Sequence, residues 1–224
     1  MWRKSEKTFL KNGILNLPFY EKIKFCKMNL KQTQKHFVLL LETSWADSTP
    51  HQIDPEYRNF FRGSHVKLHE KLPQFVLRVE KQNQNTKEFS HCDLLEAAHG
   101  QLLMSLKLLE TLINIDIKNL QLFDCQVTFE PTGQELPYKL VNIVGVAKAL
   151  DLQKSNCTID ENGFVETFTT LRLNESAIKD LDLFRLFERL PLIIISDRVK
   201  QAIEQAGITG VRIINDTEWE PGML

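Results

Sequence analysis

The strongest constraint on the fold is a short unit near the C-terminus, residues 192–214, whose pattern indicates strand, helix and strand. It begins with a β-branched apolar run long enough for a buried strand. Ser196 follows, and its hydroxyl can accept a hydrogen bond from the free N–H groups of the next helical turn. Apolar residues then recur at helical spacing, and Gly207 can adopt the left-handed conformation that ends a helix. We therefore expect a capped amphipathic helix whose apolar face is formed by Val199, Ala202, Ile203 and Ala206, followed by a strand that returns toward the core.

The same pattern occurs once earlier, over residues 102–123. When Ser105 is set on Ser196, an offset of 91 residues, six apolar positions keep register through the helix and the second strand. Residues 93–95 also resemble residues 182–184, which lead into the later unit. Any two strand–helix–strand units look somewhat alike, but a register kept near half the chain length favours an internal repeat. The expected fold class is α+β, with a mixed or antiparallel sheet and these two related units.

Composition limits the class of protein. A chain of 224 residues with 42% hydrophobic and 25% charged residues can bury a core that needs no metal or disulfide. The formal net charge of −1 argues against a general nucleic-acid binder. The four cysteines are scattered without a CxxC pair, which fits a reducing compartment. We expect a cytoplasmic protein, because no stretch has the length of a membrane span and the N-terminus lacks the apolar core of a secretion signal.

The charges are unevenly distributed along the chain. Residues 1–35 hold nine Lys and Arg against two Glu, a local balance of +7 that leaves −8 for the rest. Such a segment can contact an acidic partner, but it is interleaved with apolar residues that favour packing on the body. We expect residues 1–90 to form a basic arm and strands packed on an α+β domain of residues 91–224. No long linker separates the parts, so one intimate two-lobed unit is expected, of unknown oligomeric state.

Several other elements are expected from local patterns. Residues 36–43 and 73–80 predict strands, whereas Ser, Asp, Thr and two prolines in residues 43–55 predict a loop. The segment from residue 93 is ambiguous, and we expect a short helix, a short extended segment at residues 101–104 and then a helix from Leu106. Further strands are expected at residues 120–130, 138–146, 157–159 and 164–173, the last two joined by a hairpin turn.

Two stretches of the C-terminal half resemble a known family. Residues 136–155 contain a tyrosine, an apolar strand with Asn, a Leu-Asp pair and then Ser; here these are Tyr138, Asn142, Leu150, Asp151 and Ser155. Residues 194–213 contain the strand, Ser, amphipathic helix and terminal Gly-hydrophobic pair, after a short Leu183-Phe184 segment. Both are similar to predicted immunity proteins of bacterial polymorphic toxin systems, the eleventh numbered immunity family. The resemblance covers roughly residues 90–214 and is strongest over residues 136–214.

The resemblance implies a protein that binds and neutralises one cognate toxin in the cell that produces it. Its motifs are structural in character, so it supplies no catalytic residues, no cofactor and no toxin-binding surface. Two other classes stay open: an enzyme, such as a hydrolase or a toxin-modifying enzyme, and a regulatory or scaffold module of a bacterial signalling pathway. The gene next to this one would separate the three, because a secreted toxin there favours immunity.

A polar constellation could also support chemistry. Asp151 and Ser155 are close in sequence, and Asn142 precedes them, so an acid–hydroxyl site can be drawn. The structural interpretation is favoured, in which Asp151 caps a turn and Ser155 satisfies backbone groups. No histidine lies nearby in sequence to act as a base. We therefore assign no catalytic residue.

Histidine and cysteine give two further candidate sites. His65 and His69 would share a helix face and could hold a metal, but the HExxH context is missing, so surface histidines are favoured. His91, Cys92 and Asp93 are consecutive, and neighbours on a strand point to opposite faces, which makes a shared metal difficult. Phosphate-binding glycine motifs are absent from the sequence. No metal or cofactor is expected.

Overall fold

The computed structural model describes residues 34–42, 46–50, 59–60, 62–68, 72–79, 92–97, 100–220 and 222–223. The basic arm expected before residue 34 therefore lies outside the described residues. The strands are β1 (His36–Leu41), β2 (Ala46–Pro50), β3 (Gln74–Val79), β4 (Leu94–Ala97), β5 (Gln101–Ser105), β6 (Leu120–Asp124), β7 (Gln126–Phe129), β8 (Gln134–Leu136), β9 (Tyr138–Ile143), β10 (Val146–Ala147), β11 (Asn156–Ile159), β12 (Val165–Thr170), β13 (Leu183–Leu186), β14 (Ile193–Ser196) and β15 (Val211–Ile214). The α-helices are α3 (Leu106–Asn114), α4 (Glu175–Ile178) and α5 (Asp197–Gln205).

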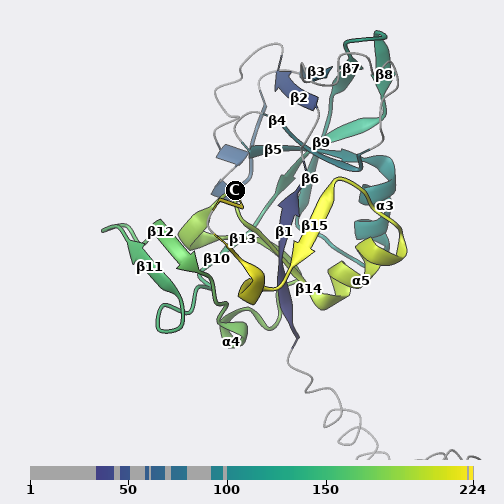
Figure 1. Cartoon of the computed structure of the whole chain (residues 1–224). Helices are drawn as coiled ribbons and strands as arrows, with labels where there is room; N and C mark the ends of the chain where they lie inside the picture. Colours follow the sequence, from purple (N-terminus) through teal and green to yellow (C-terminus); the bar gives the residue numbers. More distant parts are fainter. Residues whose placement is uncertain are drawn as a thin grey trace, which may run out of the picture. The chain divides into compact units, whose positions relative to one another are not determined.

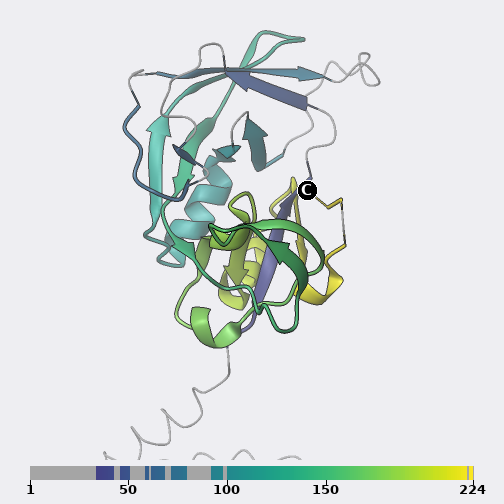
Figure 2. The same cartoon turned by 90° about the vertical axis from the view of Figure 1, so that its left-hand side faces the viewer.

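The fold is α+β, as expected, and strands dominate it (Figure 1). The described strands form a five-stranded sheet of order β10-β13-β14-β1-β15 and an eight-stranded sheet of order β6-β9-β5-β4-β2-β3-β7-β8. Both sheets contain parallel and antiparallel pairs. A separate hairpin of β11 and β12 lies in front of β1 in the second view (Figure 2).

The two expected strand–helix–strand units are present as β5–α3–β6 and β14–α5–β15. Each helix begins after a serine whose hydroxyl caps it. Ser105 accepts from the Leu108 N–H at 3.1 Å, and Ser196 accepts from the Val199 N–H at 3.4 Å. Val199 and Ile203 are buried, and Gly207 has a positive φ just beyond α5. The helix boundaries and the buried face of α5 are therefore confirmed.

The units are alike in their pairing as well as in their local structure. β5 and β6 flank β9, and β14 and β15 flank β1, all antiparallel. Ser105 lies opposite Tyr138, Ser196 lies opposite His36, and the ladders continue in the same register. The strand before each unit also matches. β4 pairs antiparallel with β5, and β13 pairs antiparallel with β14 in the corresponding register. We call β4, β5, α3, β6 and β9 the first repeat, and β13, β14, α5, β15 and β1 the second repeat. In sequence, the central strand β9 comes after the other elements of the first repeat, whereas the central strand β1 comes before the other elements of the second repeat.

The two repeats share one hydrophobic core. Both helices contribute to it, together with one face of each sheet. The other face of the five-stranded sheet packs against β11 and β12 and forms a second hydrophobic cluster. The other face of the eight-stranded sheet forms a third hydrophobic cluster. The shared core contains Phe37, Leu39, Leu94, Leu102, Met104, Leu108, Leu109, Leu112, Ile117, Val141, Ile143, Leu183, Ile193, Ile195, Val199 and Ile203.

Some of the expected elements differ from the structure. The single strand expected at residues 120–130 is divided into β6, which pairs with β9, and β7, which pairs with β3 and β8. Residues 46–50, expected within a loop, form β2 and pair antiparallel with β3, from Ala46 opposite Val79 to Pro50 opposite Phe75. Residues 94–97, expected as part of a short helix, form β4, which turns back on β5 near Gly100. At β2 and β4, pairing with a neighbouring strand overrides local preference, because every residue offers a backbone C=O and every residue except proline also offers an N–H. None of the helices in the described part of the chain has both the length and the apolarity needed to cross a bilayer.

Candidate functional site

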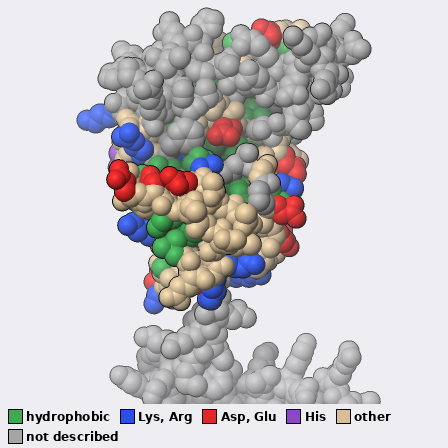
Figure 3. Space-filling view, turned by 60° about the vertical axis from the view of Figure 1, so that its left-hand side comes forward, with side chains coloured by type: hydrophobic (Ala, Val, Ile, Leu, Met, Phe, Trp, Pro, Cys, Tyr) green, Lys and Arg blue, Asp and Glu red, His purple; other side chains and the backbone are tan. Residues whose placement is uncertain are grey.

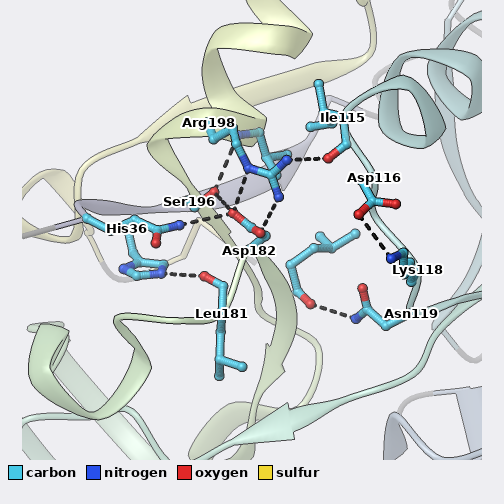
Figure 4. A network of polar contacts seen from close by, with 12 residues as sticks. His36, Ile115, Asp116, Lys118, Asn119, Leu181, Asp182, Ser196 and Arg198 are labelled. Carbon is cyan, nitrogen blue, oxygen red and sulfur yellow. Dashed lines mark hydrogen bonds and ion pairs between the residues drawn. The ribbon is translucent and has the colours of Figure 1, made fainter. Parts of the chain in front are cut away.

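A polar network surrounds Asp182, the residue that precedes β13 (Figure 4). The Ser196 hydroxyl donates to Asp182 Oδ1 at 2.6 Å, and Gln34 Nε2 donates to the same oxygen at 3.0 Å. Arg198 binds both oxygens, through Nε to Oδ1 at 3.3 Å and through Nη2 to Oδ2. Burial alone would raise the pKa of Asp182, but bonds from Arg198 and Ser196 outweigh it and lower the pKa. The carboxylate therefore ties the N-terminus of α5 to β13.

Asp93 holds the same place in the first repeat and is fully buried. The Ser105 hydroxyl donates to Asp93 Oδ1 at 2.6 Å. Thr209 donates to Oδ2 from its N–H at 2.9 Å and from its hydroxyl at 3.1 Å, and Lys107 Nζ lies 3.8 Å away. Burial again raises the pKa, but these partners more than compensate, so the pKa of Asp93 is lowered. Each repeat thus uses one Asp–Ser pair to hold the start of its helix.

Lys107 and Arg198, which are equivalent in α3 and α5, each reach the end of the other helix. Lys107 Nζ donates to the carbonyl oxygen of Gly207 at 2.7 Å, and Arg198 Nη1 donates to that of Ile115. The N-terminus of each helix therefore meets the C-terminus of the other, so the helices run antiparallel. The repeats are related by an approximate two-fold axis, and each cation lies where the helix dipole favours it.

His36 and Tyr138 begin the two central strands and bond in equivalent ways. The Tyr138 hydroxyl donates to the carbonyl of Cys92, and His36 Nε2 lies 2.8 Å from the carbonyl oxygen of Leu181. His36 Nδ1 lies 2.5 Å from Oε2 of Glu175. Both ring nitrogens of His36 therefore have an oxygen partner within the fold. His36 is buried by these contacts rather than presented to a substrate.

Arg185 in β13 is 1% exposed and is the feature that sequence reasoning missed most clearly. Its Nη2 donates to the carbonyl of Gly100 at 3.0 Å, and its Nη1 donates to that of Leu190 at 3.4 Å. Burial lowers the pKa of Arg185 to about 10, a shift that the charge of Glu96 opposes. Glu96 is the equivalent of Arg185 in β4, so opposite charges face each other between the repeats. The sequence signal that could have revealed the buried Arg185 is a charged residue within the apolar run of residues 183–187.

The proposed acid–hydroxyl constellation is not assembled. Asp151 Oδ1 accepts the N–H groups of Gln153 and Lys154, each at 3.2 Å, as a turn cap does. Ser155 Oγ accepts the N–H of Arg172 at 3.0 Å and so satisfies the backbone. Asn142 instead donates its side-chain amide to the carbonyl of residue 64 at 2.7 Å. The favoured structural interpretation of Asp151 and Ser155 is confirmed.

The histidine and cysteine candidates lie only partly within the described residues. His65 lies in a segment, residues 65–68, that has no helical structure, and His69 and His91 lie outside the described residues. Cys92 and Asp93 are both buried, and Asp93 is held by Ser105 and Thr209 as described above. In the described part of the chain, no group of three His, Cys, Asp or Glu side chains could hold a metal ion.

The outward side of α3 is the candidate surface for binding. Leu106 is 46% exposed and Ile113 is 54% exposed, two turns apart on one side of the helix. Glu110 lies between them and is also exposed. On β6, which follows α3, Leu122 is 44% exposed. Two large apolar side chains exposed on one side of a helix, as Leu106 and Ile113 are, are typical of contacts with another macromolecule.

The surface on the side of β11 and β12 carries polar, charged and hydrophobic side chains together (Figure 3), and Ile159 of β11 is 44% exposed. Thr158 and Thr167 face each other across this hairpin, with their hydroxyl oxygens 2.8 Å apart. Acidic and basic side chains both occur on the described part of this face, which shows no field of a single sign (Figure 3). A surface of this kind gives no support to binding of nucleic acid.

Comparison with known protein families found a match. The model of an immunity protein family (Imm11) matches residues 24–215. The match covers both repeats, including β1, and confirms the family resemblance seen in the C-terminal half. No curated protein matches the chain.

Proposed function

This chain belongs to the Imm11 immunity protein family, and we propose that it binds one cognate toxin protein and neutralises it by stoichiometric occlusion rather than by catalysis. The family match over residues 24–215 is the observation that carries the proposal. The site geometry supports it, because Asp93, Asp182 and Arg185 hold secondary structure together and are not presented in an open cleft. The producing cell's cytoplasm is the proposed place of action.

An occluding inhibitor must outcompete substrate and capture the toxin before damage occurs. We therefore expect nanomolar affinity or better, about −12 kcal/mol or more favourable. The uneven charge of the chain, +7 over residues 1–35 and −8 over the rest, can steer a charged toxin toward it. The association rate should then fall as salt rises, because ions screen charges beyond a Debye length of about 8 Å at 0.15 M.

A titration of toxin activity tests the proposal. The probe is the toxin encoded beside this gene, purified and assayed against increasing amounts of the full chain. We expect protection to saturate at a fixed stoichiometry. Protection should also survive single replacement of Asp151, Ser155, Cys92 or His69 in variants that stay folded. Protection at far substoichiometric amounts that disappears with one of these replacements would instead show an enzyme.

A further inference from the structure

We propose that the outward side of α3, formed by Leu106, Glu110 and Ile113, is the centre of the surface that binds the toxin. This inference rests on the proposed function and adds the location and the partner's chemistry. The partner offers an apolar pocket or groove for the two hydrophobic side chains, with a Lys or Arg that meets Glu110. Because α3 lies on the rigid shared core, this surface is formed before binding.

The second repeat provides an internal control for this surface. α5 has the same length, cap and packing as α3, yet Asp197 stands where Leu106 stands and Glu204 stands where Ile113 stands. Both helices bury their opposite sides in the same core. The fold therefore does not require hydrophobic residues at these two outward positions. Exposed hydrophobic residues that the fold does not need are best explained by a partner.

The difference continues along the flank of the helix. Leu109, which is buried beside the exposed pair, has Lys200 as its equivalent. Lys200 covers the core with its stem and places Nζ 4.4 Å from the centre of the Phe37 ring, near solvent. On α3 the apolar surface therefore continues from the buried Leu109 to the exposed Leu106 and Ile113. On α5 the charged Lys200 ends the apolar surface at the equivalent position. This asymmetry assigns the binding role to α3.

Charge argues for a toxin rather than a second copy of this chain. Glu110 lies about one turn from both Leu106 and Ile113, so two α3 helices packed about a two-fold axis would bring their Glu110 carboxylates together. Like charges placed face to face oppose association. A nine-residue helix is also only about 13 Å long, too short to supply alone the roughly 800 Å² per partner of a specific complex. The exposed pair therefore fits the apolar centre of a larger, mostly polar interface.

The test transplants the outward residues of α5 onto α3. The double variant Leu106→Asp and Ile113→Glu carries side chains that the fold accepts at equivalent positions, and Asp in the first turn suits the helix dipole. Binding of the full chain to an inactivated form of the neighbouring gene's toxin is measured by calorimetry. We expect an affinity at least 100-fold weaker, with an unchanged thermal midpoint. The matched control, Gln201→Ala with Glu204→Ala on α5, should bind within about twofold of the original chain.

Charge reversal tests the partner's chemistry. Glu110→Lys should weaken binding tenfold or more, Glu110→Gln should weaken it less, and Gln201→Lys on α5 should leave it unchanged. Tighter binding by Glu110→Lys would show an acidic partner at this point and overturn the assigned chemistry.

The remaining outcomes distinguish this inference from the proposed function. If the original chain binds the toxin and the double variant binds equally well, the surface is wrong while the function stands. If the original chain neither binds nor protects, both are overturned. Two results would reveal another occupant and also overturn the inference. A dimer in sedimentation that the double variant loses would identify a second copy, and a lower thermal midpoint of the free double variant would identify a segment of this chain.

Discussion

Asp116 and Gly207 occupy equivalent positions after α3 and α5, and both have a positive backbone φ, of 61° and 59°. A residue in this left-handed conformation ends many helices, and glycine adopts it without the steric conflict of a Cβ atom. Asp adopts it at some cost, because its short polar side chain tolerates the conformation better than most. The repeats have therefore kept the backbone geometry at this point while the residue differs.

This equivalence predicts opposite effects for two substitutions. Gly207→Ala should destabilise the protein by about 1 kcal/mol, the cost of a left-handed L-residue. No atom lies within 4 Å of the Cβ that it would add, so only backbone strain contributes. Asp116→Gly should be neutral or slightly stabilising, because it removes strain and loses only an exposed ion pair with Lys118. Urea denaturation of both variants measures the two changes, and equal effects would contradict the equivalence.

The two capping serines should differ in their importance. Loss of an N-cap alone costs about 1 kcal/mol, but each serine also donates to a carboxylate. Asp93 is fully buried, whereas the Asp182 side chain is 26% exposed and can recruit water. We expect Ser105→Ala to cost about 2–3 kcal/mol and Ser196→Ala about 1–2 kcal/mol, because an unsatisfied buried carboxylate is the more expensive. Thermal unfolding of both variants gives the comparison, and a larger loss for Ser196→Ala would reverse the ranking.

The Asp93 and Asp182 carboxylates also predict a pH dependence. The pKa values of Asp93 and Asp182 are lowered in the folded protein relative to the usual value of 3.8. Their contribution to stability is therefore complete above the unfolded pKa and is lost as pH falls through the lower folded values. Thermal midpoints should fall steeply as pH decreases from 5 to 3. Asp93→Asn should lower the midpoint at neutral pH and show a shallower acid dependence, and an unchanged slope would show that other groups dominate.

Sequence reasoning found the repeat because apolar spacing and cap residues are local signals. Ser105, Ser196 and the helices that follow them were predicted with nearly correct boundaries. β4 was missed although residues 93–95 resemble residues 182–184, because Leu, Glu and Ala are strong helix formers. β2 was missed because its residues favour loops, and only pairing with β3 gives them strand geometry.

The candidate surface could not be predicted from local patterns alone. Leu106 and Ile113 look like core residues in an apolar helix until the structure shows which side of α3 is buried. The 91-residue register already sets them against Asp197 and Glu204, so the signal was present in the sequence. It becomes interpretable only when both helices are known to have the same environment. The contact of Arg185 with Gly100 and that of His36 with Leu181 join residues more than eighty positions apart, which no local pattern contains.

The shared core predicts that the two repeats unfold together. Leu112 and Ile203 are equivalent, each 3% exposed, and both belong to the same cluster between the sheets. Leu112→Ala and Ile203→Ala should each cost roughly 2–5 kcal/mol by leaving a cavity. Because either cavity opens into the core that both repeats line, each variant should keep one cooperative transition at a lower temperature. Differential scanning calorimetry measures this directly: two separated peaks in either variant, or a midpoint unchanged by Ile203→Ala, would show that the repeats have independent cores. The surface variant Glu204→Ala, on the outward side of the same helix, should leave the transition within about 0.5 kcal/mol of the original protein.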